Sequence, residues 1–425
     1  MTKKAVYLFG AGAAIPWNAP NTSDLTTLVL NSGFYCKNGT KRVTQKIVET
    51  LSNYFPIEEI NFETILNVIE ELLVFHSSRD YKNTNSFLFP FLESRCFLDE
   101  IFNYEMNGDW QHGSSLIIKG FELESGKSSF SNQSPQQFYL QLLYANVLTV
   151  ISARVSSYSY HTTEVTKVVT ENNRELNNNF YNWINSEVGN NSTVRLYTLN
   201  YDRLFSVLLK KRGINIFEGA ECESELTPEE ILPFDVKKIA TDFTSNIHYN
   251  LHGSSFWDVR NRNHHQLPSI QYFLTGAPNL SSNLWEQPLA QMEKGKIINP
   301  SNIITGYQKT QKTSMSPFRQ MQSAFDRDCL EANKLIIIGY SFGDAHLNET
   351  IRMAIIHNPN IDIEVIDPNF RKNKLDEKIG LELLSNSEIS LSPTNLSENS
   401  CSFLNGKVKV NEYYFDEYLN QFKAI

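Results

Sequence analysis

The sequence predicts an α/β protein with a doubly wound, mainly parallel sheet and a large helical insertion. Two observations predict it: an apolar run at 5–9 leads into Gly10-Ala11-Gly12, and another at 334–338 leads into a glycine loop and a helical stretch. Neither run alternates apolar with polar residues, as is expected of strands covered on both faces. Strands that each lead into a loop and a helix are typical of this fold class.

Three further strands complete the predicted sheet. Short apolar segments at 194–198 and 362–366 have the same character, and a last strand is expected within 408–415. The segment 259–330 carries Pro, Asn and Ser without a clear period. We therefore expect loops and short helices there.

The region between the first strand and residue 194 is expected to be helical. Residues 62–75 place their apolar side chains on one helical face, and 138–155 form a second apolar segment that reads as a buried helix. The Asn- and Ser-rich stretch 171–193 is expected to be a loop back to the sheet. The predicted units are a discontinuous sheet domain, residues 1–44 and 191–425, and a helical insertion or lid, residues 45–190.

Composition narrows the class of protein. A chain of 425 residues is long for one ordinary core, which indicates two or three packed units. Its 38 basic and 47 acidic residues give a net charge of −9, which argues against a duplex-binding protein. We expect neither a direct nucleic-acid partner nor a membrane partner, because no apolar stretch is long enough to span a bilayer without interruption.

The termini and cysteines predict a cytoplasmic protein. The first apolar run stops at a glycine after five residues, which is too soon for a signal peptide. The five cysteines are far apart, odd in number and form no C-x-x-C pair. The spacing therefore gives no support for a zinc cluster or a disulfide framework, and we expect a reducing compartment and no bound metal.

The first glycine loop has the spacing of a phosphate-binding turn. Gly10 and Gly12 allow a tight turn and a close backbone approach to a pyrophosphate, beside the N-terminus of the next helix. A dinucleotide-binding fingerprint has a third glycine where Ile15 stands. On this motif alone, an ordinary strand-to-helix turn is the more common explanation of the loop.

The second glycine loop fits the nucleophile elbow of serine hydrolases. Gly339-Tyr-Ser341-Phe-Gly343 follows a strand and precedes a helix, as G-x-S-x-G does in that fold. That fold needs an acid and then a histidine after the serine, and no histidine follows His357. A hydrolase triad in the usual order is therefore excluded, and Ser341 as a helix or turn cap remains open.

Taken in chain order, the motifs are more specific than any one of them. A strand followed by GAG, then TLNYD at 198–202, LHG at 251–253, GYSFGDAHL at 339–347 and VIDPN resembles the SIR2-like family. More narrowly, the order resembles the NAD-consuming SIR2-like proteins of bacterial antiphage defence. The resemblance covers about a third of the chain and implies a Rossmann-like sheet of the SIR2 type, with NAD as substrate.

The resemblance also implies roles for particular residues. The first glycine loop would hold the NAD pyrophosphate, and the second would line the adenosine side, with an acidic residue near the adenine ribose. The positions that match these binding loops are Gly10, Ala11, Gly12, Ala14 (where the family often has Ser), Gly339, Ser341 and Asp367. Asn200 and Asp202 match the family's Asn-x-Asp, which positions the nicotinamide ribose and carboxamide, and His252 matches its catalytic histidine.

Departures from the family separate its possible reactions. Zinc-dependent deacylases of the family carry two cysteine pairs between the histidine and the second glycine loop, where this chain has only Cys329. Leu199 stands where deacylases usually have Gln. These departures disfavour deacylation and favour NAD hydrolysis to nicotinamide and ADP-ribose, as the effector of an abortive-infection system. A non-catalytic sensor that binds NAD or ADP-ribose remains the alternative.

The predicted reaction needs a base and oriented polar groups. Asp202 is expected to hold the carboxamide, Asn200 to order the ribose or water, and His252 to act as base, with a pKa near 6.5 that suits neutral pH. A toxic activity implies restraint, so a homo-oligomer or a partner defence protein is also expected.

Overall fold

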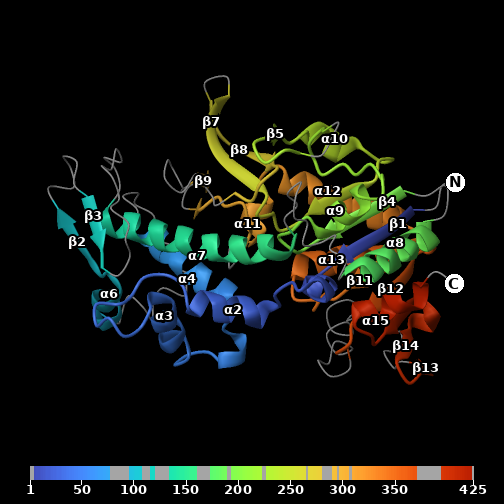
Figure 1. Cartoon of the computed structure of the whole chain (residues 1–425), viewed down its shortest axis with the longest axis horizontal. Coiled ribbons are helices and arrows are strands. Elements are labelled where there is room, and N and C mark those ends of the chain that lie inside the picture. The colour runs from blue at the N-terminus through green and yellow to red at the C-terminus, as the bar shows by residue number, and fades with distance from the viewer. Residues whose placement is uncertain are drawn as a thin grey trace.

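The computed structural model describes the chain with gaps (Figure 1). The described residues are 4–76, 95–107, 115–119, 134–159, 173–188, 193–222, 226–264, 267–279, 290–293, 296–305, 309–370 and 394–423.

A mixed, mostly parallel sheet forms the centre of the described structure, with helices on both faces. Its strand order is β13-β14-β15-β12-β11-β1-β4-β6. The pairings β13–β14 and β14–β15 are antiparallel, and the other pairings in this sheet are parallel. The strands are β1 (Lys4–Phe9), β4 (Thr193–Thr198), β6 (Ile247–Asn250), β11 (Lys334–Ile338), β12 (Asp362–Ile366), β13 (Thr394–Ser397), β14 (Ser400–Phe403) and β15 (Val408–Asn411). This confirms the predicted α/β fold class.

The order of the strands reverses at β1. From β1 the chain passes to β4 and β6 on one side, and then crosses to β11, β12 and β15 on the other. β1 pairs in parallel with both β11 and β4. In open α/β sheets ligands bind outside the carboxyl ends of the strands at such a reversal, so the topology by itself points to the loops after β1 and β11.

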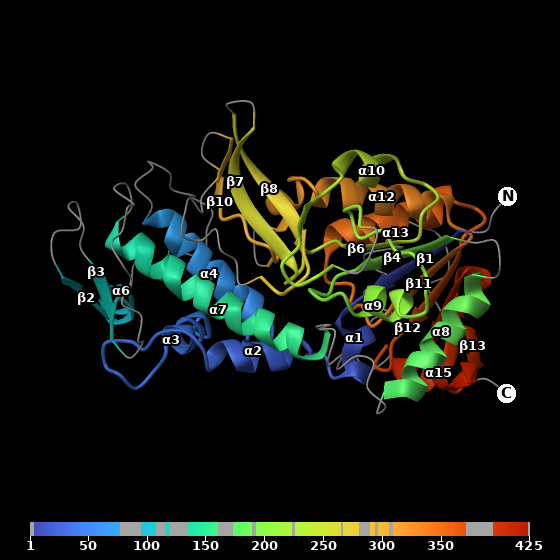
Figure 2. The same ribbon diagram turned by 45° about the horizontal axis from the view of Figure 1, so that its top comes forward.

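Helices cover both faces of the sheet because β1 is apolar on both. Tyr7 and Phe9 pack into one hydrophobic cluster, while Val6 and Leu8 pack into the other. The first face carries α8 (Arg174–Val188), α9 (Leu204–Lys210) and α15 (Phe415–Leu419), and the second carries α10 (Val236–Thr241), α12 (Phe318–Glu331) and α13 (Ala345–His357), as Figure 2 shows.

A helical unit extends from one end of the sheet (Figure 1). It contains α2 (Thr22–Leu30), α3 (Val43–Leu51), α4 (Phe62–Phe75), α6 (Arg95–Ile101), α7 (Pro135–Ser159) and the hairpin β2 (Tyr104–Asn107) and β3 (Ser115–Ile118). Its buried side chains belong to the same hydrophobic cluster as Tyr7 and Phe9 of the sheet. The two predicted helices are confirmed, and the domain boundaries at 44 and 190 stay a prediction.

Helix α7 is apolar enough, and long enough, to cross a membrane by composition alone. About 67% of its apolar 18-residue stretch is buried inside the protein, where α7 packs against α4. Burial by protein accounts for its apolar composition, so α7 is a core helix of the fold, as the sequence predicts.

Two expectations about local structure are wrong, and a third is confirmed over a shorter range. The stretch 171–193 contains helix α8 instead of a loop, because Phe180, Trp183 and Ile184 are buried against the sheet. The segment 259–330 contains a long hairpin, β7 (Trp257–His264) with β8 (Leu267–Thr275), and helix α12. The last strand expected within 408–415 is confirmed as β15, which ends at Asn411, and the remainder of that range leads into α15.

Candidate functional site

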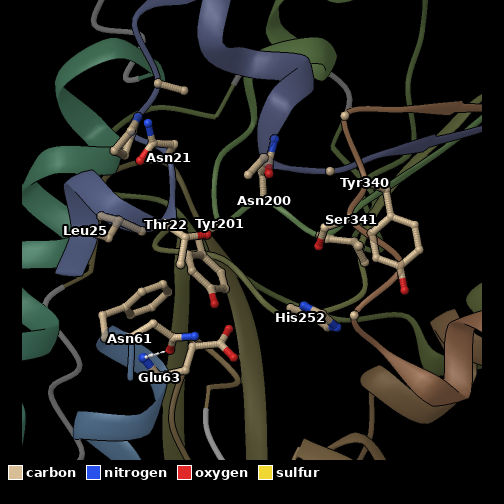
Figure 3. Close-up of a pocket in the computed structure, with 18 of the residues that line it drawn as sticks. Asn21, Thr22, Leu25, Asn61, Glu63, Asn200, Tyr201, His252, Tyr340 and Ser341 are labelled. Carbon is tan, nitrogen blue, oxygen red and sulfur yellow. Dashed lines mark hydrogen bonds between the residues drawn. The ribbon is translucent and has the colours of Figure 1, made fainter. Parts of the chain in front are cut away.

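A cavity of about 450 Å³ opens at the carboxyl ends of β1, β4, β6 and β11. Its volume lies within the range of small-molecule sites. In Figure 3 the loops after the strands, with Asn200, Ser341 and His252, form one wall. The other wall comes from the helical unit, with Leu25 of α2 and Glu63 of α4. The site is therefore composite, and neither unit encloses it alone.

The two glycine loops meet at the centre of this site. The Gly10 amide donates to the Ile338 carbonyl at 2.8 Å, and the Gly12 amide donates to the Gly339 carbonyl at 3.1 Å. Gly339 has φ +58°, and a Cβ built there would lie 2.4 Å from the Gly12 Cα. These glycines are required by the close approach of two backbones, whether or not a phosphate binds.

Helix α1 (Ala11–Ala14), which follows the first loop, has only four residues and continues as a short 3₁₀ turn. The helix N-terminus expected beside a pyrophosphate is therefore a brief one. Gly10 and Ala11 line the cavity, whereas Gly12 and the buried Ala14 are not among its lining residues.

Asn200 lies on the loop after β4, with its side chain at the cavity. Its amide nitrogen Nδ2 is buried and has no hydrogen-bond partner among the described residues. The loop itself is fixed by Asn250, whose Nδ2 donates to the carbonyls of Asn200 at 2.9 Å and Asp202 at 2.8 Å. Since buried donors are normally paired, a ligand acceptor at this point would satisfy Asn200.

His252 lies on the loop after β6 and is 3% exposed. Burial lowers its pKa from 6.5 to about 3; Asp344 opposes this shift, while Lys309 and His346 add to it. Its Nε2 atom has no hydrogen-bond partner among the described residues and lies 3.9 Å from Asp344 Oδ1. The expected pKa near 6.5 is therefore wrong: the ring is a neutral, weakly basic hydrogen-bonding group at pH 7.

Charged residues not predicted from the sequence also line the cavity. Lys309 of α11 (Lys309–Thr313) lies 2.9 Å from Glu63 Oε2 and 3.2 Å from Asp344 Oδ1. Burial raises the pKa of Asp344, but the His252 ring and the Lys309 ammonium outweigh it and hold that pKa below its ordinary value. Tyr201 also lines the cavity, and its side chain hydrogen-bonds Glu63.

Asp202 lies beneath the cavity and does not line it. Its carboxylate is fully buried, accepting the Tyr158 hydroxyl at 2.6 Å and the Leu204 amide at 2.9 Å. Burial raises its pKa, and both hydrogen bonds oppose that rise. In this structure Asp202 anchors the loop of Asn200 to Tyr158 of α7, a lining residue from the helical unit.

The second glycine loop reaches the cavity through Gly339, Tyr340, Ser341 and Gly343. Phe342, between the last two, is fully buried with φ +55°, a conformation that side chains other than glycine rarely adopt. Ser341 is exposed and stands at the cavity wall between Asn200 and His252 (Figure 3).

Asp367, at the carboxyl end of β12, is not among the residues that line this cavity. It accepts the amide of Asn369 at 2.8 Å, and burial raises its pKa. The structure thus brings together Gly10, Ala11, Asn200, His252, Gly339 and Ser341, and leaves Gly12, Ala14, Asp202 and Asp367 around them. Among the described residues no group of three or more His, Cys, Asp and Glu side chains is arranged to hold a metal ion.

Sequence reasoning missed Glu63, Lys309 and Asp344. Asp344 belongs to the GYSFGD string, so its place after the strand was a usable signal. Glu63 stands in the first turn of α4, where an acidic residue is ordinary, and Lys309 is one of many lysines. Only the packing of α4 in the helical unit and of α11 beside α12 brings these two to the site.

Comparison with known proteins finds one family that part of the chain resembles. Residues 194–384, somewhat under half of the chain, match the model of the SIR2-like domain family. The matched region includes Asn200, His252 and the second glycine loop. No curated protein matches the sequence.

Solved structures give weak overall likeness. One is the crystal structure of a Sir2 homologue–NAD complex, at 13% identity and TM-score 0.37, covering 99% of this chain and 88% of that chain. Another is a mutant Sir2 homologue–ADP-ribose complex, at 12% identity and TM-score 0.32, covering 86% of this chain and 81% of that chain.

Proposed function

We propose that the protein is an NAD⁺ glycohydrolase that cleaves NAD⁺ to nicotinamide and ADP-ribose. The observation that carries the proposal is the pair of buried, unpartnered nitrogens, Asn200 Nδ2 and His252 Nε2, at one cavity. The SIR2-like domain match and the reversal of strand order at this cavity support a nucleotide ligand. An unsatisfied buried polar atom costs about 1–3 kcal/mol, which ligand binding recovers.

The reaction breaks the bond between the ribose C1′ and the cationic nicotinamide. Nicotinamide leaves as a neutral molecule with the bonding electrons, water adds to C1′, and one proton is released. The transition state carries positive charge on the sugar. Among the described residues that line the cavity, the carboxylates of Glu63 and Asp344 are accompanied by one lysine, Lys309, so the local charge favours a cation.

The polar nitrogens supply orientation. Asn200 Nδ2 is a donor only and would hold an acceptor oxygen of the substrate or the attacking water. His252 is neutral at pH 7 and would accept a hydrogen bond through Nε2 from a ribose hydroxyl or from water. A ring with a pKa of about 3 is a poor base, so orientation is its first role, and it takes the proton of the attacking water only once addition to C1′ has made that water strongly acidic.

Two conservative variants test these roles. Asn200→Asp keeps the shape of the side chain but replaces the donor with an acceptor, and His252→Gln keeps a neutral polar group. We expect each to lower nicotinamide release by about 10²–10⁴-fold, measured by chromatography of NAD⁺ incubated with purified protein. Wild-type rates in both variants would contradict the proposal.

Calorimetric titration with NAD⁺ separates catalysis from sensing. The glycohydrolase predicts binding together with release of nicotinamide by the wild type, and binding without release by His252→Gln. Tight NAD⁺ binding without release by the wild type, including in extracts of phage-infected cells, would instead identify a sensor. We further propose that NAD⁺ depletion during phage infection is the biological output, which is measured as His252-dependent loss of cellular NAD⁺.

A further inference from the structure

We propose that Lys309 is a positioning residue for the NAD⁺-cleaving reaction: its ammonium group holds the Asp344 carboxylate away from the His252 ring and ties that arrangement to Glu63 of the helical unit. This inference rests on the proposed function and deepens it. In this inference, residues of α4 and α11 influence the protonation of His252, although neither helix belongs to the loops that follow the strands.

The geometry places two groups in competition for one oxygen. Asp344 Oδ1 lies 3.2 Å from Lys309 Nζ and 3.9 Å from His252 Nε2. The shorter distance is a hydrogen bond, and the longer one is not. Lys309 therefore holds the carboxylate that would otherwise be the nearest partner for the unpartnered Nε2 atom.

Among the described residues, three titratable groups act on the charge of the His252 ring. Asp344 and His346 face His252 from the start of α13, and Lys309 faces it from α11. Glu63 of α4 lies behind Lys309 and binds its ammonium at 2.9 Å. An opposite charge at about 4 Å favours the protonated form of a histidine, so the partner of Asp344 sets how strongly that carboxylate raises the pKa of the ring.

A second ion pair joins the same two helices without reaching His252. Lys312, three residues after Lys309, is buried and binds Glu70, seven residues after Glu63. The Glu70 carboxylate also accepts the Tyr144 hydroxyl of α7. The Lys312 pair thus fastens α11 to the helical unit in the same way, which makes it a matched control for loss of a buried lysine.

Loss of the Lys309 charge has a definite sign. In Lys309→Met the freed Asp344 carboxylate is expected to pair with His252, which favours the protonated ring and raises its pKa. The neutral acceptor is then lost at a higher pH than in the wild type. The acid limb of kcat/KM, set in the wild type by a ring pKa of about 3, should move up by about one pH unit, so that kcat/KM falls about fivefold at pH 3 and is unchanged at pH 6.

Two readouts test this, and one of them needs no catalysis. The first is the pH profile of nicotinamide release. The second is the pH titration of the His252 ring by NMR, assigned with His252→Gln. Lys309→Met should raise the ring pKa, Lys309→Arg should restore wild-type behaviour, and the double variant Lys309→Met/Asp344→Asn should abolish the shift. Lys312→Met should lower thermal stability and leave the titration of His252 unchanged.

The possible failures are distinguishable. If the wild type releases no nicotinamide but the ring titrates as described, the proposed function fails and the positioning role stands. An unchanged ring pKa in Lys309→Met, or an equal rise in Lys312→Met, overturns the positioning role. Should Lys309→Met fail to fold, Lys309→Gln, which keeps a polar side chain without the charge, provides the test: an unchanged ring pKa in that variant also overturns the inference.

Discussion

Burial acts on the two motif residues His252 and Asp202 in different ways. His252 is buried at the cavity with Nε2 free, and its pKa falls to about 3, so it stays neutral. Asp202 is buried below the cavity and satisfied by Tyr158 and Leu204. The first residue is therefore available to a ligand, whereas the second organises the loop that carries Asn200.

The anchoring role of Asp202 makes a prediction about Tyr158. Tyr158→Phe removes the hydroxyl that donates to Asp202 Oδ2 and leaves a buried carboxylate oxygen without that partner. We expect a loss of about 1–3 kcal/mol in the free energy of unfolding, measured by urea denaturation. Tyr54→Phe, on a tyrosine that is 59% exposed, is the control. Equal stability of the two variants would contradict the anchor.

At the scale of elements, the loops after β1 and β11 depend on each other. The Gly12 amide binds the Gly339 carbonyl, and no room for a Cβ exists between them. This contact joins the two strands on either side of the point where the strand order reverses. The shape of the cavity floor follows from that contact.

Gly339→Ala tests this dependence. Its left-handed backbone costs about 1–2 kcal/mol for a residue with a side chain, and overlap with the Gly12 backbone adds roughly 1–3 kcal/mol. Gly343→Ala, in the same loop, meets only Ser341 Oγ at 3.6 Å and should be nearly neutral. Thermal unfolding compares the two, and similar melting temperatures would show that the close approach is not needed.

Much of this architecture could be predicted from the sequence. The strands at 5–9, 194–198, 334–338 and 362–366 are continuous apolar runs, and the structure confirms them within one residue. A strand that is buried on both faces is apolar at every position, so it can be recognised from its own sequence.

The elements that the sequence did not predict combine polar and apolar residues without a clear period. Helix α8 is rich in Asn, and its buried Phe180 and Trp183 are a small part of its sequence. Strand β7 alternates apolar and charged residues only at its start. At the site, the motif residues were predictable, whereas Glu63 and Lys309 arrive only through tertiary packing, which leaves no local pattern.

At the scale of the molecule, buried neutral histidines predict acid lability. His248 of β6 is fully buried, and burial lowers its pKa from 6.5 to about 4. Between these pH values the unfolded chain binds a proton that the folded chain does not bind, so stability is present above pH 6.5 and is lost as the pH falls. His252 acts in the same direction.

His248→Gln should flatten this dependence. We expect the difference in unfolding free energy between pH 7 and pH 4.5 to shrink by about 1–3 kcal/mol relative to the wild type, measured by urea denaturation at both pH values. His357→Gln, at an exposed histidine, is the control and should leave the difference unchanged. An unaltered difference in His248→Gln would contradict the assignment.

The most direct test of the central claim is a time course of nicotinamide release from NAD⁺ by the purified wild-type protein beside His252→Gln. The account predicts equal amounts of nicotinamide and ADP-ribose from the wild type and a rate at least a hundredfold lower from the variant. Equal rates from both proteins, or NAD⁺ bound by the wild type and recovered intact, would contradict it.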